Sequence, residues 1–189
     1  MLGPLIAFGL GVAAALLSGG SLDRFAEARF RRAPLFWLSL VAPLVVAFGP
    51  GRSRTVPFAV AIVVISNLLL VAFALSNRHV PGLTLVALGV FLNALVITLN
   101  GGMPVSAAAG REAASTQFVG SIKHEPLTDE TLLPLLADRI PVGPAGQVWS
   151  LGDLLLVAGV GLMGFGLPRR RDRSNFLERG RKNTSSAPA

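Results

Sequence analysis

The chain has 189 residues, of which 52% are hydrophobic and only 14% charged. A soluble domain carries nearer a quarter charged residues, so the composition favours an integral membrane protein. The absence of cysteine excludes disulfides, thiolate catalysis and cysteine metal sites. The formal net charge is +7, but the basic residues stand in short segments at the ends of apolar runs, which argues against a nucleic-acid-binding protein.

Five apolar runs follow one another along the chain, and Asp153 is the only charged residue within them. About 20 apolar residues in a helix cross a hydrocarbon core of about 30 Å. The expected spans cover about residues 2–20, 33–50, 56–76, 81–99 and 151–167. The sequence therefore predicts an all-α integral membrane protein, a bundle of five transmembrane helices with a partly structured extracytoplasmic loop at residues 100–149.

The distribution of basic residues predicts the orientation of this bundle. The segments 22–32, 76–80 and 168–189 hold twelve basic residues, whereas 51–55 and 100–149 hold five. Positive charge stays cytoplasmic, so we expect the N-terminus outside and the C-terminus inside a bacterial plasma membrane. The basic tail at 168–189 is expected to be largely disordered beyond about residue 175, and to meet anionic lipid at Arg169, Arg170 and Arg171.

Small residues repeat in the first and last spans. They are Ala7, Gly11 and Ala15 in the first span, and Gly159, Gly161, Gly164 and Gly166 in the last. This pattern lets helix backbones approach closely. We expect it to serve packing within one bundle, with the interface of a homo-oligomer as the alternative.

Two asparagines and one aspartate lie inside the spans. Asn67 and Asn93 fall half-way along the third and fourth spans, where they could pair with each other as interhelical glue or line a substrate path. Asp153 falls in the first turn of the fifth helix. It can stabilise that helix start, or act as a functional intramembrane acid.

The long loop contains several recognisable signals. Asn-Gly-Gly at 100–102 predicts a left-handed helix end, with an anion-binding backbone nest as the weaker alternative. Residues 107–114 predict a short helix, and residues 120–126 a short extended segment ending at Pro126. Thr128 predicts the start of a further helix, whose leucines would lie on the bundle as an interfacial helix or lid.

Most of the ionisable side chains outside the basic ends lie in this loop. They are Lys123, His124, Glu125, Asp129, Glu130, Asp138 and Arg139. One histidine without cysteine is a poor metal signal, so we expect no metal and no cofactor. Solvated charges and salt bridges are the ordinary interpretation of such a group.

Several short segments together resemble an uncharacterised family of bacterial multi-pass membrane proteins, a domain of unknown function. The matching residues are Asn93, Asn-Gly-Gly-Met-Pro-Val at 100–105, Gly-Ser-Ile-Lys-His at 120–124, Asp129, Thr131, Leu133, Asp138, Ile140, Pro141 and Ser-Leu-Gly-Asp at 150–153. The likeness covers about residues 1–167. It implies membrane location and supplies no chemistry, but it suggests that these segments form one structured cap.

Three functions remain open. The first is a small-molecule binding or transport-associated protein, whose site lies between the outer loop and the span ends. Its tentative binding residues are Asn100, Gly101, Gly102, Lys123, His124 and Asp153. The second is a structural or assembly subunit that binds another membrane component. The third and weakest is an outer-leaflet enzyme with His124 as base, oriented by Asp129 or Asp138.

Overall fold

The computed structural model describes residues 3–48, 56–113, 124–143 and 146–169. The α-helices are α1 Gly3–Leu17, α2 Leu22–Ala26, α3 Ala33–Phe48, α4 Val56–Ser76, α5 Leu83–Asn100, α6 Ala107–Glu112 and α7 Leu151–Gly166. Two short 3₁₀ helices are η1 Pro134–Leu136 and η3 Leu167–Arg169. The strands are β1 Met103–Val105, β2 His124–Pro126, β3 Ile140–Val142 and β4 Gln147–Trp149.

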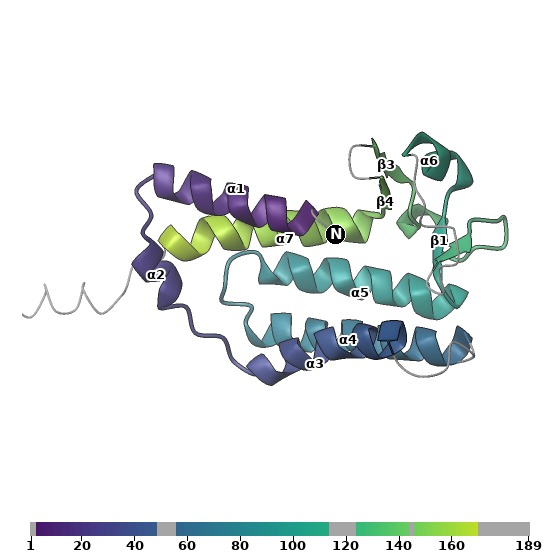
Figure 1. Ribbon diagram of the computed structural model, residues 1–189, viewed down its shortest axis with the longest axis horizontal. Coiled ribbons are helices and arrows are strands. Elements are labelled where there is room, and N and C mark those ends of the chain that lie inside the picture. The colour runs from purple at the N-terminus through teal and green to yellow at the C-terminus, as the bar shows by residue number, and fades with distance from the viewer. Residues whose placement is uncertain (1–2, 49–55, 114–123, 144–145, 170–189) are drawn as a thin grey trace, which may run out of the picture.

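The five long helices lie side by side and form one bundle (Figure 1). They contact one another in the order α3, α4, α5, α7, α1. Consecutive neighbours from α3 to α7 are antiparallel, whereas α1 and α7 run in the same direction (Figure 1). The short helix α2 lies at one end of the bundle, and the strands with α6 lie at the other (Figure 1).

The predicted membrane class agrees with the helix lengths, but only in part. Within the described residues, three stretches are long and apolar enough to cross a bilayer: Phe58–Ser76, Leu83–Asn100 and Leu151–Arg169. The first two expected spans are also helical, but α1 and α3 have only 15 and 16 residues. The helices suggest a membrane location, and the number of five spans is not confirmed by length alone.

Glycines set the distance between α7 and both of its neighbours. A methyl group on Gly89 of α5 would overlap the carbonyl oxygen of Gly152, and one on Gly11 of α1 would overlap that of Gly161. Such close approach replaces side-chain packing by direct contact between backbones, as in membrane helix pairs generally. The small residues of the first and last spans therefore pack within one bundle, as predicted.

At the α2 end, Asn77 joins the segment between α2 and α3 to the end of α4. Its side chain is fully buried. Its Oδ1 accepts from the Arg31 amide at 2.6 Å, and its Nδ2 donates to the carbonyl oxygens of Arg31 and Phe73, each at 2.8 Å. The ring of Phe73 also lies against the rings of Phe30 and Phe36. The side-chain amide of Asn77 thus provides hydrogen-bond partners for backbone groups of Arg31 and Phe73.

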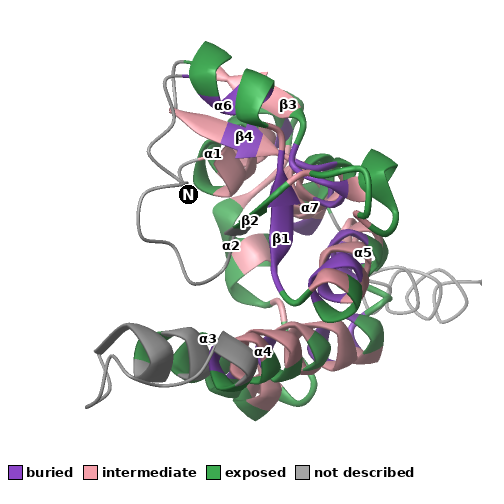
Figure 2. Ribbon diagram, turned by 90° about the vertical axis from the view of Figure 1, so that its right-hand side faces the viewer, coloured by how far each residue is buried: buried purple, intermediate pink, exposed green. Residues whose placement is uncertain are grey.

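The described part of the long loop contains short strands and helices. We call the described elements β1, α6, β2, η1, β3 and β4 together the cap. Strands β1 and β2 pair in parallel, with Met103 opposite His124, and β3 and β4 form an antiparallel hairpin. Strand β1 is buried along its whole length and stands at the centre of the cap (Figure 2).

Two of the local predictions for the loop are confirmed, and one is wrong. The helix predicted at 107–114 is α6, capped by Ser106, and β2 is the described part of the predicted extended segment. The helix predicted from Thr128 does not form. Thr131 Oγ1 accepts from the Thr128 amide at 2.9 Å, which closes a turn instead, and Leu133 has a positive φ of 56° just before η1.

The glycine contacts predict unequal effects at two nearby positions of α1. Gly11→Ala should destabilise the bundle by about 1–3 kcal/mol because the added methyl group has no room against α7. Gly9→Ala is the matched control, since nothing lies within 4 Å of its added methyl group. Unfolding in detergent mixtures measures both variants, and equal stabilities would contradict the described α1–α7 packing.

Candidate functional site

The candidate site lies where α7 begins, part-way along α5. Gly152 in the first turn of α7 faces Gly89, so the second half of α5 extends beyond the start of α7. The cap occupies the corner that this offset leaves (Figure 1). Polar residues at the start of α7 are consequently enclosed by two helices and the cap rather than exposed at a helix end.

Asn93, Ser150 and Asp153 form a closed hydrogen-bond network in this corner. Asn93 Nδ2 donates to Asp153 Oδ1 at 2.9 Å, and Ser150 Oγ donates to Asn93 Oδ1 at 2.9 Å. Ser150 and Asp153 also form a capping box: each side chain accepts from the other's backbone amide at 3.0 Å. The network joins the middle of α5 to the first turn of α7 and satisfies the amides of that turn.

Asp138 lies in the cap close to this network. Its backbone is fixed to β1, because its amide donates to the Pro104 carbonyl and its carbonyl accepts from the Ser106 amide, both at 2.9 Å. Its side chain is only 4% exposed. Burial, and secondly the negative charge of Asp153, raises the pKa of Asp138 from 3.8 to about 8. The carboxyl group of Asp138 therefore favours its protonated, neutral form at neutral pH.

Asn100, Gly101 and Gly102 end α5, but they do not line this corner with free groups. Gly101 has a φ of 74° and caps α5 in the left-handed conformation, which confirms the predicted helix end. The Asn100 side chain binds the backbone of Leu132 in both directions: its Nδ2 donates to the carbonyl at 3.0 Å, and its Oδ1 accepts from the amide at 2.8 Å. Gly102 is buried. These residues fasten the cap to α5.

The structure describes only some of the other predicted residues. His124 belongs to β2, beside Met103, whereas Lys123 lies outside the described residues. Arg169 ends η3 at the α2 end of the bundle, with its guanidinium 4.9 Å from the centre of the Phe165 ring. Arg170, Arg171 and the remainder of the tail also lie outside the described residues.

The suggested pair of Asn67 and Asn93 does not form. Asn93 instead faces α7, and within the described part of the chain the Asn67 side chain makes no hydrogen bond. Asn67 shares a face of α4 with Val60, Val63 and Val64, which pack towards α5. Asn67 therefore lies on the face of α4 that is turned towards α5, whereas the Asn93 side chain is turned towards α7.

Sequence reasoning did not give Ser150 or Asp138 the place that the structure gives them. Ser150 stands directly before the apolar run, with Asp153 three residues later, and this spacing is a recognisable capping-box signal. Asp138 was named as a loop charge and as a residue that could orient a His124 base. No local pattern shows that it is buried, because its burial depends on β1 and α7, which are distant in sequence.

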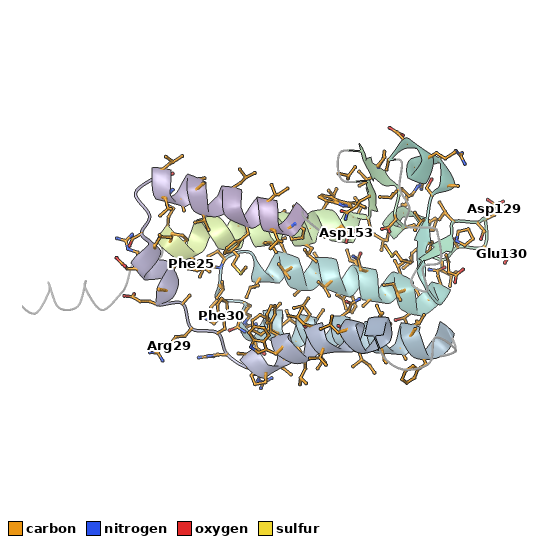
Figure 3. The ribbon with its side chains drawn as sticks, viewed as in Figure 1. Phe25, Arg29, Phe30, Asp129, Glu130 and Asp153 are labelled. Atoms are coloured by element: carbon orange, nitrogen blue, oxygen red, sulfur yellow. The ribbon has the colours of Figure 1, made fainter. Side chains whose placement is uncertain are left out.

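The described residues at the two ends of the bundle differ in charge. Arg29 lies at the α2 end, and Asp129 and Glu130 lie at the far tip of the cap (Figure 3). Among the described residues, the α2 end holds Arg24, Arg29, Arg31, Arg32, Arg78 and Arg169 against Asp23 and Glu27. The described part of the cap end holds Glu112, Glu125, Asp129, Glu130, Asp138 and Asp153 against Arg111 and Arg139.

Metal binding receives no support from the described residues, in which no group of three or more histidine, cysteine or acidic side chains is placed to hold an ion. The network offers amide, hydroxyl and carboxylate oxygens instead. Such a set suits hydrogen bonding and charge pairing with a small molecule.

Comparison with known proteins identifies a family without an assigned role. The profile of a family of unknown function (DUF5317) matches residues 27–165, which include every residue of the candidate site. An uncharacterised protein of Thermotoga maritima is 35% identical over 115 residues, covering 59% of this chain and 67% of that protein. No solved structure matches the chain.

The network predicts that the asparagines of α4 and α5 differ in their contribution to stability. Asn93→Leu should destabilise the protein by about 1–3 kcal/mol, because Asp153 and Ser150 each lose one hydrogen-bond partner in a part-buried corner. Asn67→Leu should change the stability little or raise it. Unfolding midpoints in detergent measure both, and a larger loss in Asn67→Leu would contradict the assignment.

The raised pKa of Asp138 predicts a pH dependence of stability. Between pH 3.8 and about 8 the folded chain holds a proton on Asp138 that the unfolded chain has released, so this group's contribution to stability decreases as pH rises through that window and levels off above it. Asp138→Asn should therefore flatten the dependence of the unfolding midpoint on pH. Glu112→Gln, at an exposed position of the cap, should leave the dependence unchanged; equal slopes in the wild type and Asp138→Asn would contradict the raised pKa.

Proposed function

The chain belongs to the DUF5317 family, whose function is unknown, and we propose from its site that it is a membrane protein binding a small positively charged molecule, such as a protonated amine, at its extracytoplasmic face. In this proposal α1, α3, α4, α5 and α7 all span the bilayer, with the N-terminus outside. The arginines of the α2 end then face the cytoplasm, in agreement with the usual distribution of positive charge. The cap is extracytoplasmic.

One observation carries the proposal: the carboxyl group of Asp138 is buried in the cap, and the negative charge of Asp153 acts on it as well. A buried carboxylate near a second acid is unfavourable unless a proton or a cation compensates it. The pKa of Asp138, raised to about 8 first by burial and secondly by Asp153, expresses this cost in the absence of a ligand. A cationic ligand would remove the same cost by replacing the proton.

The surrounding charges support a positively charged ligand. Asp129 and Glu130, at the tip of the cap, and Glu125 in β2 are exposed acidic residues. Acidic surfaces of this kind raise the local concentration of cations and exclude anions. Polar atoms of Asn93 and Ser150 lie beside Asp153 and could orient hydrogen-bonding groups of the ligand after rearrangement.

A structural or assembly subunit is the second candidate, and a different observation favours it. The side chains of Asn93, Ser150 and Asp153 already satisfy one another, which is what a network serving only to join α5, α7 and the cap requires. In that case the cap end would bind another membrane component or a second copy of the chain. This candidate needs no small ligand.

Native mass spectrometry of protein extracted gently from its own membrane separates these proposals. A binding protein should carry a reproducible extra mass of small-molecule size at about pH 9 and lose it at about pH 5, because the proton competes with a cation for the carboxylates. Asp138→Asn should abolish the extra mass, whereas Glu112→Gln, also in the cap but exposed, should retain it.

Two results would contradict the binding proposal. A co-purifying protein chain without any small molecule would favour the assembly subunit. An extra mass that is equally retained at both pH values and in Asp138→Asn would mean that a ligand binds elsewhere, through other groups.

A further inference from the structure

We infer that residues 132–135 of the cap form an anchor that inserts into the outer leaflet of the bilayer. Leu132, Leu133 and Leu135 are 52%, 41% and 74% exposed. Three large apolar side chains presented together by a short segment are unusual on a surface that faces only water. The inference rests on the membrane-spanning arrangement proposed above and is independent of the ligand.

The segment is held at a defined height by α5. Both backbone hydrogen bonds of Leu132 go to the side chain of Asn100, the last residue of that helix. On the other side of the segment, Leu136 packs against Val96, Ile97 and Met103. If α5 spans the bilayer, its end lies at the membrane–water boundary, and the leucines are fixed at that level.

The segment's conformation is imposed by these attachments. Leu133 has a φ of 56°, which a leucine rarely adopts and which persists only where the surroundings fix it. The leucine side chains of this segment are exposed, while its backbone is hydrogen-bonded to the end of α5.

The helix that holds the segment also exposes large apolar side chains. Leu99, next to Asn100, is 44% exposed, and Phe91, two turns below, is 45% exposed; in a spanning helix these side chains face lipid. The acids of the same loop, Asp129 and Glu130, instead lie at the outermost tip of the cap (Figure 3). The acidic tip therefore suits water, whereas the leucines suit contact with lipid acyl chains.

The absence of cysteine from the chain allows a direct test with single-cysteine variants of the full-length protein in lipid nanodiscs. Leu135→Cys, labelled with an environment-sensitive fluorophore, should show blue-shifted emission that is quenched by lipids brominated in their acyl chains and protected from aqueous iodide. Glu130→Cys is the matched control from the same loop, and it should give water-like emission that iodide quenches. Leu132→Cys repeats the test if labelling at Leu135→Cys disturbs folding.

Each other outcome overturns the inference. Quenching of Leu135→Cys by iodide as strong as that of Glu130→Cys would place the leucines in water. Protection from both quenchers would mean that protein covers them, either a partner or a second copy. The orientation is tested separately, because Glu130→Cys should react with an impermeant maleimide added to intact cells; its failure to react would reject the proposed topology, while the depth measurement would still decide whether the leucines meet lipid.

Discussion

The two hydrogen bonds that join Asn93 to Asp153 and to Ser150 fix the position of α7 along α5. An amide and a carboxylate cannot be left without partners between two apolar helices, so the register that satisfies them is strongly preferred over a register one turn away. In this register Gly152 faces Gly89, and the backbones can touch. Polar satisfaction and close packing therefore select the same arrangement.

The cap depends on this register. Because α7 begins well below the end of α5, the described elements of the cap lie in the corner between the two helices. Strand β1 enters this corner directly after α5, and Asp138 pairs with it in parallel, hydrogen-bonded to the backbone on both sides of Val105. The carboxyl group of Asp138 is buried there and is influenced by the charge of Asp153. The candidate site is thus a consequence of how far the two helices are offset.

Much of the bundle could be predicted from the sequence, because apolar runs and their ends are local signals. The end of α5 at Gly101 and the start of α7 at Ser150 follow from residue types whose backbone preferences act within one turn. The small residues of α1 and α7 similarly indicated close packing. The same reasoning failed for residues 128–136, where Thr131 and Leu133 close turns that compete with a helix.

The candidate site could be predicted only in part, because it is assembled from several parts of the chain. Asp153 and Asn93 were recognisable as polar residues in apolar surroundings, although the partner of Asn93 could not be chosen without the rotation of α5. The burial of Asp138 and the pairing of β1 with β2 require contacts between distant segments, and three-residue strands have no periodicity to detect. The hydrogen bonds of Asn100 to Leu132, which is 32 residues later, also could not be read from a local pattern.

The parallel contact between α1 and α7 has a consequence for biosynthesis. The first long helix packs against residues 151–166, so α1 is synthesised well before its partner. At about 5–20 residues per second, the wait is on the order of 10 s. In the proposed spanning arrangement, the face of α1 that carries Gly11 meets lipid during this time. Completion of α7 is then the step that joins the beginning of the chain to the bundle.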